Sequence, residues 1–573
     1  FVELVDVDNA DPNTNLAIGT QVTGPTTFDG TNWSNLVPDQ SRTAIIASSF
    51  TGAPDTFIAC NLTIEAGVDV NYDSYGASSN SFVIYGDLIV DGSLTIGDQE
   101  SLVVFNQNAS LGTITKLENS NPHNFVNDLT YWASPVQGSQ ISTVFAGSRP
   151  DRIFEFRAGE PNPIYPTSNF KYWWIASGAM VQGRGYAVEG VGTGVQSITF
   201  TGIPYNGPWV KNLWYSGTPD NTPTANENFN LIGNPYPAAI DVNKLLVDNA
   251  GFVSEIALWT HSTEVGPGGE YFDADYVYYS VTGPSTPGVT ENIGSGQGFM
   301  IRTLADGALA LSDEYVLIGR NDQFFKGARN TESKKNVVAS VGNEDKVWLR
   351  MNLGREKSDI LVAFMNEATD GYDASYDVTG NLYDSNISLI EKKIKFYSKI
   401  DNNKFVTQGM GPFDSSRKVS LGFDTKKQGD FRISLTKTLG ALETAEIFLI
   451  DHSLNIRHDL KRSDYVFYQT ELGDFSDRFT LEFVDSDSIS DLGDAIDRDR
   501  FNISNDFDIM NVNSGKLVKD INVYDMLGRM VIHKVPNLKS FQLNTSMVRN
   551  GTVLIIEARL EDGTLMNTKS IKY

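Results

Sequence analysis

Short segments that alternate apolar and polar residues, each ending at a glycine or a polar turn, constrain this fold more than any other feature of the sequence. Between residues 57 and 115 they follow one another closely, as NLTIEAGVDV, YGDLIVDG, SLTIG and SLVVFNQNASLG. Alternation over so few positions is typical of a β-strand, and its repetition predicts strands stacked rung on rung. We therefore expect a short β-solenoid or packed meander at 57–115, with its open ends covered by neighbouring parts of the chain.

The same alternation continues over most of the chain and predicts further β-domains in series. Residues 116–330 are rich in aromatic side chains and punctuated by glycine and proline, which favours a β-sandwich or jelly roll. Residues 335–485 predict a second sandwich, and residues 1–56 form an acidic, turn-rich N-terminal segment. With 50 glycines and few strong helix formers, the composition agrees with an all-β fold.

A small C-terminal unit is predicted after an acidic stretch. Residues 486–500 carry many aspartates and few large apolar side chains, so we expect a flexible linker there. Within 501–573, INVYDMLGRMV predicts a hairpin that turns at Gly528, because glycine readily adopts the positive φ of a tight turn. A second hairpin is predicted with its turn at Glu561–Gly563. Together these strands favour a small immunoglobulin-like sandwich.

The charge of the chain excludes several classes of partner. A formal charge of −26 and a pI near 4.6 repel phosphate backbones and anionic lipid, so we expect no nucleic acid as a partner. No run of about 18 apolar residues exists, so we expect no direct membrane span. Residues 501–573 carry +2, from six Lys and three Arg against five Asp and two Glu, while the preceding residues carry −28. This contrast suits a separate recognition module, and a chance fluctuation in composition is the alternative.

Catalytic motifs are not apparent, so we expect a protein that is not an enzyme. The single cysteine, Cys60, excludes an internal disulfide and a thiolate metal cluster. The five histidines are scattered and show no metal-ligand spacing, and no G-x-S-x-G motif is present. The glycines of GSGQG precede a strand-like segment rather than a helix, which favours a turn over a dinucleotide site. Among the 71 acidic residues, the sequence neither excludes nor identifies a pair of carboxylates suited to glycoside hydrolysis.

No cofactor is predicted. A calcium site in the N-terminal segment is possible but is not supported by the sequence. Asp6, Asp8, Asp11 and Asn13 are spaced somewhat like the ligands of a calcium loop. The glycine of the sharp turn and the glutamate that closes such a loop are missing. A solvated acidic segment is the alternative interpretation.

Aromatic residues in 116–330 allow two interpretations. Exposed flat rings stack on sugars, whereas buried rings fill the space between two sheets. In KYWWI neighbouring side chains point to opposite faces of a strand, so we expect at least one of Trp173 and Trp174 to face outward. These two residues are the candidate contacts with a glycan or another surface.

The stretch from Leu129 to Phe325 resembles modules found repeatedly in large cell-surface proteins exported by the bacterial type IX secretion system. Its motifs are YWASPV, GRGYAVEG, FTGIPYNGP, LIGNPYPAAID, GSGQGFMI and NDQFF. The next unit is similar to the usual sequel of such modules through VWLRMNL, FMNEATDGYD, LGFDTKKQGDFRISL, IRHDL and GDFSDRFTLEF. The resemblance implies a secreted, adhesin-like surface protein related to those of gliding motility.

The end of the chain resembles the type A C-terminal sorting domain of that system. The features of this domain fall on Val523, Tyr524, Asp525, Leu527, Gly528, Arg529, Asn550, Gly551, Lys569 and Lys572. Two features depart from the pattern: FNISNDFDIMNV replaces the opening YPNP signature, and Val553 stands where a tyrosine is usual.

The resemblance implies partners and a location. Residues 501–573 would be recognised by the type IX translocon and by an outer-membrane shuttle β-barrel, and the protein would reach the extracellular cell surface. Because the chain begins with Phe1, we expect a processed product or a fragment. The alternative function is a glycan-binding accessory part of a larger secreted polysaccharide-degrading enzyme.

Overall fold

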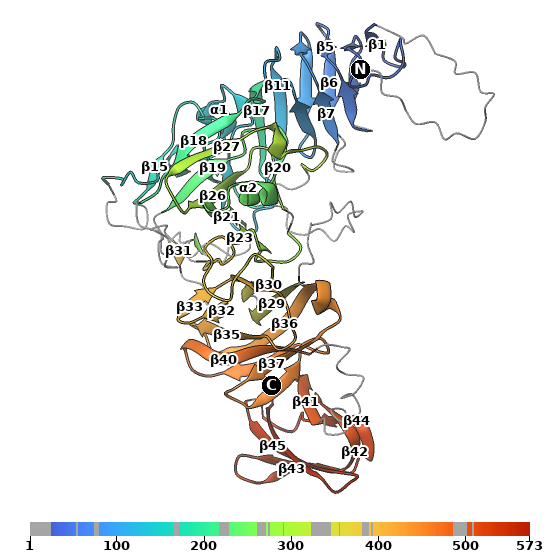
Figure 1. Ribbon diagram of the computed structural model, residues 1–573, viewed down its shortest axis with the longest axis vertical. Helices are drawn as coiled ribbons and strands as arrows, with labels where there is room; N and C mark the ends of the chain where they lie inside the picture. The colour runs from blue at the N-terminus through green and yellow to red at the C-terminus, as the bar shows by residue number, and fades with distance from the viewer. Residues whose placement is uncertain are drawn as a thin grey trace, which may run out of the picture.

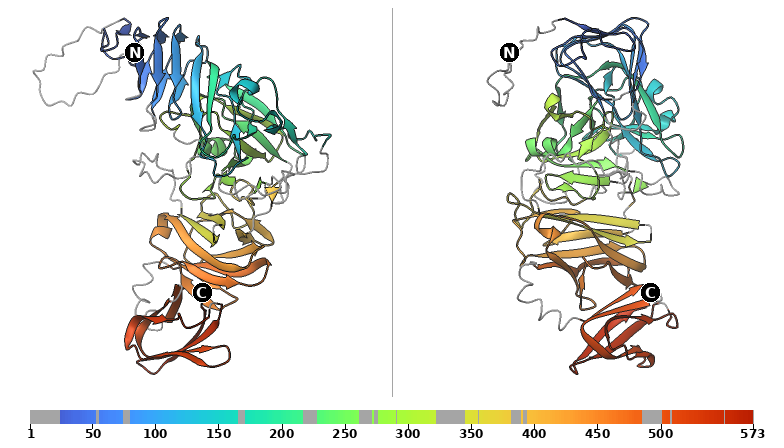
Figure 2. Two further views of the ribbon diagram at one scale, coloured as in Figure 1. Left: turned by 180° about the vertical axis from the view of Figure 1, so that it is seen from behind. Right: turned by 90° about the vertical axis from the view of Figure 1, so that its right-hand side faces the viewer.

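The protein is almost entirely β-structure, which confirms the predicted all-β fold. The computed structural model describes residues 24–572 except 53–54, 74–79, 165–170, 217–227, 261–270, 273–275, 290, 322–344, 355, 381–388, 391–393, 485–500, 507–508 and 550. Helical structure in the described part is limited to short elements: α1 (Ile141–Val144), α2 (Val242–Asp248) and the 3-10 turns η1 (Pro150–Arg152), η3 (Asp313–Tyr315) and η5 (Gly440–Glu443). The units follow one another along a long axis (Figures 1 and 2).

The N-terminal part is a three-sided parallel β-solenoid, one of the two folds that the repeat at 57–115 predicted. The solenoid already begins at Thr26, so the predicted boundary between an acidic segment and the solenoid at residues 56 and 57 is wrong. Its strands are β1 (Thr26–Phe28), β2 (Ala44–Ile46), β3 (Phe50–Thr51), β4 (Phe57–Ala59), β5 (Leu62–Ile64), β6 (Asp69–Tyr72), β7 (Ser81–Ile84), β8 (Leu88–Val90), β9 (Ser93–Ile96), β10 (Ser101–Val104) and β11 (Ile114–Asn119). Successive coils place β2, β5 and β8 on one side, β3, β6 and β9 on the second, and β4, β7 and β10 on the third. All of these neighbours pair in parallel.

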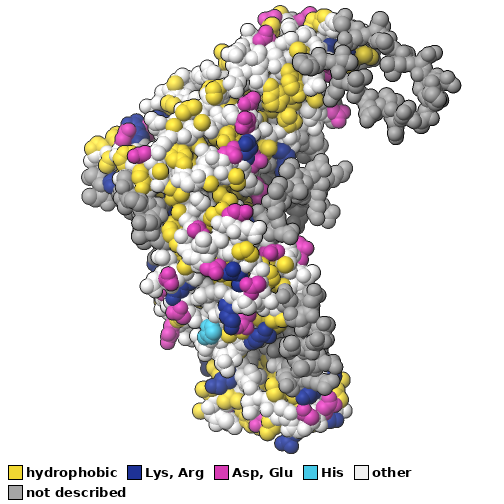
Figure 3. Space-filling view, in the orientation of Figure 1, with side chains coloured by type: hydrophobic (Ala, Val, Ile, Leu, Met, Phe, Trp, Pro, Cys, Tyr) yellow, Lys and Arg dark blue, Asp and Glu magenta, His cyan; other side chains and the backbone are white. Residues whose placement is uncertain are grey.

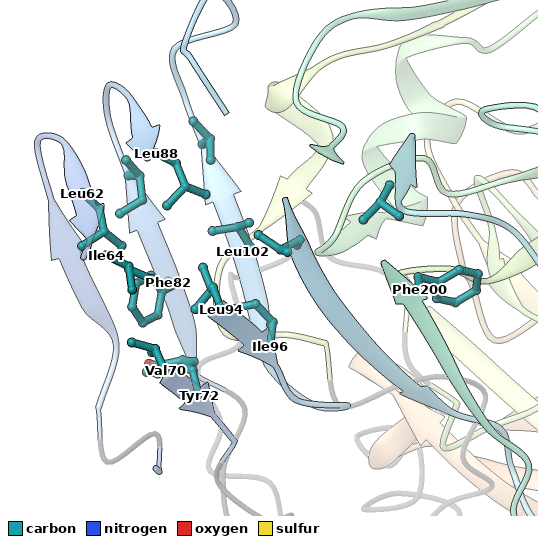
Figure 4. Close-up of a cluster of buried hydrophobic side chains, with 14 of the residues drawn as sticks. Leu62, Ile64, Val70, Tyr72, Phe82, Leu88, Leu94, Ile96, Leu102 and Phe200 are labelled. Atoms are coloured by element: carbon teal, nitrogen blue, oxygen red, sulfur yellow. The ribbon is translucent and has the colours of Figure 1, made fainter. Parts of the chain in front are cut away.

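Equivalent positions of successive coils stack inside the solenoid and outside it. Apolar side chains such as Ile64, Phe82 and Leu94 fill the interior (Figure 4). At one corner, the side-chain oxygen of Asn61 accepts a hydrogen bond from the Asp87 backbone at 2.8 Å, and Asp87 accepts one from the Ser110 backbone at 2.7 Å. These polar residues pair backbone groups that the turns leave without a partner in the sheets.

The solenoid core continues into the next part of the chain without a break. Strand β11 pairs in parallel with β9 and antiparallel with β17 (Ser197–Pro204), so the sheet changes direction at β11. The buried cluster that holds Leu94 also holds Trp132 and Phe200. The expected covering of the solenoid end is therefore present, and the predicted limit at residue 115 lies within one continuous core.

Residues 116–321 form stacked antiparallel sheets. Besides β17 they contain β12 (Leu129–Trp132), β13 (Val136–Gln137), β14 (Ile153–Phe156), β15 (Trp173–Ile175), β16 (Tyr186–Glu189), β18 (Trp209–Leu213), β19 (Phe229–Gly233), β20 (Ala239–Asp241), β21 (Val253–Trp259), β22 (Tyr271–Phe272), β23 (Tyr276–Ser280), β24 (Gly283–Pro284), β25 (Asn292–Ile293), β26 (Gly298–Thr303), β27 (Gly307–Leu311) and β28 (Val316–Leu317). The sheet β12-β16-β14-β15 faces the sheet β19-β26-β21-β23-β24 across an aromatic core. The second sheet packs its other face on α2 and on the two-stranded sheet β18-β27.

A two-sheet sandwich follows, as predicted for 335–485. Its strands are β29 (Asp345–Leu353), β30 (Glu356–Phe364), β31 (Leu389–Ile390), β32 (Ile394–Ile400), β33 (Asn403–Phe405), β34 (Thr407–Met410), β35 (Lys418–Thr425), β36 (Gly429–Leu439), β37 (Glu446–Asp451), β38 (Ile456–Asp459), β39 (Tyr465–Gln469) and β40 (Gly473–Val484). The sheet β34-β30-β29-β36-β39 packs on β33-β32-β35-β40-β37-β38 around one core. We call this unit the second sandwich. Strand β31 pairs with β22 and connects it to the preceding part.

The C-terminal unit has a core of its own. Its strands are β41 (Phe501–Asp506), β42 (Ile509–Asp525), β43 (Met530–Lys534), β44 (Leu538–Asn544), β45 (Val553–Leu560) and β46 (Leu565–Ile571). The first half of β42 pairs with β41 and β44, and its second half pairs with β43 and β45. One long strand thus belongs to both layers of a small sandwich, and both predicted hairpins are present.

Candidate functional site

The turn between β42 and β43 is organised by the carboxylate of Asp525. One oxygen accepts hydrogen bonds from the backbone of Leu527 at 2.9 Å and of Arg529 at 3.0 Å. The other oxygen accepts one from Arg529 Nε at 2.7 Å. Burial opposes ionisation of Asp525, but the hydrogen bonds from Arg529 and Leu527 prevail and lower its pKa. The turn is therefore held by an ionised side chain.

The residues of this turn divide into a supporting set and an exposed set. Val523 is fully buried in the core of the unit. Gly528 has φ +76°, a conformation that glycine adopts without strain. Met526 is 64% exposed and Leu527 is 79% exposed, so both apolar side chains project from the tip of the turn. The half-buried Tyr524 lies between the two sets.

The strand register brings other residues of the predicted sorting signal to the same end of the unit. Leu554 lies opposite Asp525, and Val553 lies opposite Ile571. Gly551, with φ +82°, donates its backbone N–H to the carbonyl of Lys572 at 2.8 Å. The Lys572 side chain is buried and the Lys569 side chain is exposed on β46. Asn550 lies outside the described residues.

The two candidate tryptophans differ in their access to solvent. Trp173 lies in the aromatic core between two sheets, so it cannot serve as a surface contact, and this part of the prediction is wrong. Trp174 points to the opposite face and is half-buried. The Arg157 guanidinium lies 4.5 Å from the centre of its ring, and its indole N–H donates to the Glu160 carbonyl at 3.1 Å. Alternation thus predicted the split between neighbours correctly.

A third tryptophan reaches the surface near Trp174. Trp214 is 40% exposed and follows the end of β18. The following aromatic residues of the same region are buried: Tyr131, Trp132, Tyr172 and Trp209. The segment WVKNLW does not alternate apolar and polar residues, so its pattern does not separate the exposed Trp214 from the buried Trp209.

The described residues offer little support for metal or cofactor chemistry. In this part of the chain no group of three or more His, Cys, Asp or Glu side chains could hold a metal ion. The acidic segment from Asp6 to Asn13 and His261 lie outside the described residues. Gly296 has φ +69° in the turn before β26, as expected for GSGQG. No described helix is long and apolar enough to cross a membrane.

One known protein family matches most of the chain. A family described as a domain of unknown function, DUF8693, matches residues 26–483. The chain belongs to the DUF8693 family. The DUF8693 region ends within β40, so the C-terminal unit lies outside it.

Other comparisons add no functional information. No curated protein matches the chain. A solved structure titled "Biofilm associated protein - BSP domain" aligns with 80% of this chain and 90% of its own, at 10% identity and a TM-score of 0.16. A likeness of this strength carries no argument about the fold or function of the DUF8693 region.

Proposed function

We propose that this chain is a secreted, non-enzymatic, adhesin-like surface protein whose residues 501–573 are its type IX export signal. The described sandwiches and solenoid would face the exterior of the cell. The C-terminal unit would bind the translocon and an outer-membrane shuttle β-barrel. The motif resemblance supports this proposal, and so does the end of the DUF8693 match at residue 483, before the C-terminal unit begins.

The observation that carries the proposal is the convergence of the sorting-signal residues at one end of a self-contained unit. The core of the unit is built from residues of 501–566 alone. Its turn is fixed by Asp525, and the same end presents Met526 and Leu527 to solvent. A prearranged turn with exposed apolar side chains binds a partner at a low entropic cost.

Strand edges offer a second contact for a β-barrel receptor. β46 is the last strand in its sheet order, so among the described residues one side of its backbone is hydrogen-bonded to no other strand. An unpaired edge can extend the sheet of another protein. The charge of +2 on 501–573, against −28 on the rest, reduces repulsion by the long acidic chain while the signal is bound.

A fusion experiment tests the export signal. Residues 486–573 are attached to a reporter with a signal peptide in a host that has this pathway, and the extracellular reporter is measured. We expect export to the surface and strong loss of export with Met526→Ser combined with Leu527→Ser. Leu565→Ser is the matched control, because Leu565 is 52% exposed at the opposite end of β46. The proposal fails if the reporter stays periplasmic while a standard sorting domain exports it.

A further inference from the structure

We propose that the surface around Trp174 and Trp214 binds an acidic saccharide, with a sugar ring stacked on an indole and the sugar carboxylate or sulfate held by basic side chains. This inference goes beyond the export role of the C-terminal unit, because it assigns a ligand class to the part of the chain that would face the exterior. The site is built from β14, β15 and β18, the turn Arg157–Glu160, and two residues just outside strands, Arg184 before β16 and Trp214 after β18.

The turn Arg157–Glu160 holds both tryptophans. The Trp214 ring lies against Gly159 so closely that a Cβ there would come within 2.5 Å of the ring atoms. Gly159 also has φ +74°, so the position requires glycine for its conformation and for the approach of the ring. Trp174 donates its indole N–H to Glu160 in the same turn. Two surface indoles therefore lie against one four-residue turn.

Buried residues fix the backbone of Trp214. Its N–H donates to Asn230 Oδ1 at 2.8 Å, and its carbonyl accepts hydrogen bonds from Asn230 at 3.0 Å and from Thr303 at 2.8 Å. Asn230 and Thr303 are buried on β19 and β26. The exposed indole thus stands on a rigid support, which is what a stacking surface needs.

Basic side chains surround a single carboxylate beside these rings. Glu155 lies directly opposite Trp174 in the register of β14 and β15. Its carboxylate accepts hydrogen bonds from Arg157 and from Arg184. The half-buried Lys211 on β18 is attracted by the charge of Glu155 and repelled by that of Arg184. Burial and then the charge of Arg184 lower the pKa of Lys211 to about 8, with Glu155 opposing them.

The local charge balance is opposite to that of the whole chain. Arg157, Arg184 and Lys211 contribute three positive charges, and Glu155 and Glu160 contribute two negative ones, in a chain of −26. A further anion would be attracted here and would favour the charged form of Lys211. The net charge of the chain disfavours an extended polyanion such as nucleic acid, whereas a short acidic sugar needs only this local excess.

Indole faces and basic side chains together select for an acidic saccharide. A flat aromatic ring stacks on the C–H face of a sugar, and arginine binds carboxylate and sulfate with directed hydrogen bonds. A neutral sugar would use only the rings, and a simple inorganic anion only the cations. The combination at one turn favours a ligand with both features.

Binding to the purified full chain tests the inference by calorimetry. The probes are tetragalacturonate, a sulfated galactan tetrasaccharide and neutral galactotetraose. We expect saturable binding of at least one acidic probe, with an affinity at least about tenfold higher than that of galactotetraose. The two acidic probes distinguish a carboxylate ligand from a sulfate ligand. Absence of binding by both, or equal binding of the neutral probe, overturns the inference.

Substitutions locate the binding to this surface. Trp214→Ala and Lys211→Ala are each expected to weaken binding of the acidic probe about tenfold. Tyr85→Ala and Lys418→Ala are controls, because Tyr85 is 39% exposed on the solenoid and Lys418 is 65% exposed on the second sandwich. Thermal melts verify that each variant is folded, and Trp214→Phe retains a stacking ring in case the alanine variant does not fold. Unchanged binding in a folded Trp214→Ala variant contradicts the assignment. Equal loss of binding in the control variants contradicts it as well.

Discussion

The second sandwich and the C-terminal unit follow one another along the chain but differ in how many large apolar side chains they expose to solvent. Among the described residues of the second sandwich, Leu472 is the single large hydrophobic side chain that is strongly exposed. The C-terminal unit is much smaller, yet it contributes nine of the 26 exposed large hydrophobic side chains found in the described residues. Exposed apolar and basic side chains lie side by side on this unit at the lower end of Figure 3.

This difference indicates that the two units serve different purposes. A small sandwich buries a smaller share of its surface than a large one, which explains part of the exposure. Size does not explain why Met526 and Leu527 occupy the tip of a turn that Asp525 holds in place. Clustered apolar exposure of this kind marks a surface that a partner covers. The second sandwich exposes no comparable cluster of apolar side chains among its described residues.

The largest expected effect comes from the buried ion pair of the second sandwich. Arg478 donates to Asp451 at 2.8 Å, and both side chains are buried. Arg478→Ala would leave Asp451 without its charge partner and should lower the free energy of unfolding by about 4 kcal/mol. Hydrogen exchange of β35–β40 in the full chain during urea unfolding measures this loss.

The control for this change is another arginine of the same unit. Arg457 is 3.6 Å from Glu482 and has a side chain that is 44% exposed. Arg457→Ala should change the stability by less than about 1 kcal/mol. Equal effects of the two substitutions would show that burial does not set the strength of these pairs.

A core substitution tests whether the two units are independent. Ile556 is fully buried in the C-terminal core, so Ile556→Ala should cost about 3 kcal/mol through lost contacts and a cavity. Hydrogen exchange should rise in β41–β46 and stay unchanged in β29–β40. A similar rise in both units would contradict the separation of their cores.

The sequence was sufficient to predict the elements that depend on local chemistry. Alternation with a period of two residues predicted the solenoid strands from Phe57 onward and both C-terminal hairpins, but not β1, β2 and β3. Gly528 and Gly563 have positive φ, at +76° and +86°, as turns at these positions require. The solenoid was also predictable because each coil repeats the pattern of the coil before it.

Features that depend on which faces are covered could not be predicted in this way. The sheet that contains β14 and β15 is buried on both faces over much of its length, so alternation separated Trp173 from Trp174 without showing which one was inside. The grouping of Glu155, Arg184 and Lys211 depends on contacts between strands far apart in the sequence. The domain limits and the sorting role stay predictions.

Acid titration should affect the two units in opposite directions. Burial raises the pKa of Asp377 in the second sandwich to about 7, although backbone hydrogen bonds oppose it. The folded state then retains a proton that the unfolded state releases above about pH 4, so this group makes the unit less stable as the pH rises from 4 to 7. The slope is at most about 1.4 kcal/mol per pH unit. Asp377→Asn should flatten it in urea unfolding.

Asp525 should contribute the opposite slope in the C-terminal unit. Its folded pKa is lowered from 3.8, so its stabilising effect is present above that value and is lost as the pH falls through the folded pKa. NMR titration of the Asp525 carboxyl group in the full chain measures the folded pKa directly. A midpoint at or above 3.8 would contradict the hydrogen-bonded turn.

The smallest expected effect on stability comes from Gly528, and it separates the shape of the turn from its exposed side chains. Gly528→Ala places a Cβ at φ +76° and should cost about 1 kcal/mol. Gly207→Ala is the control, because open space surrounds Gly207 and its φ is not positive, so no loss is expected. Urea unfolding with hydrogen exchange measures both effects. If Gly528→Ala lowers reporter export as much as Met526→Ser with Leu527→Ser does, the receptor requires the turn geometry. If export persists while the serine variant fails, the apolar side chains alone carry the signal and the glycine serves folding.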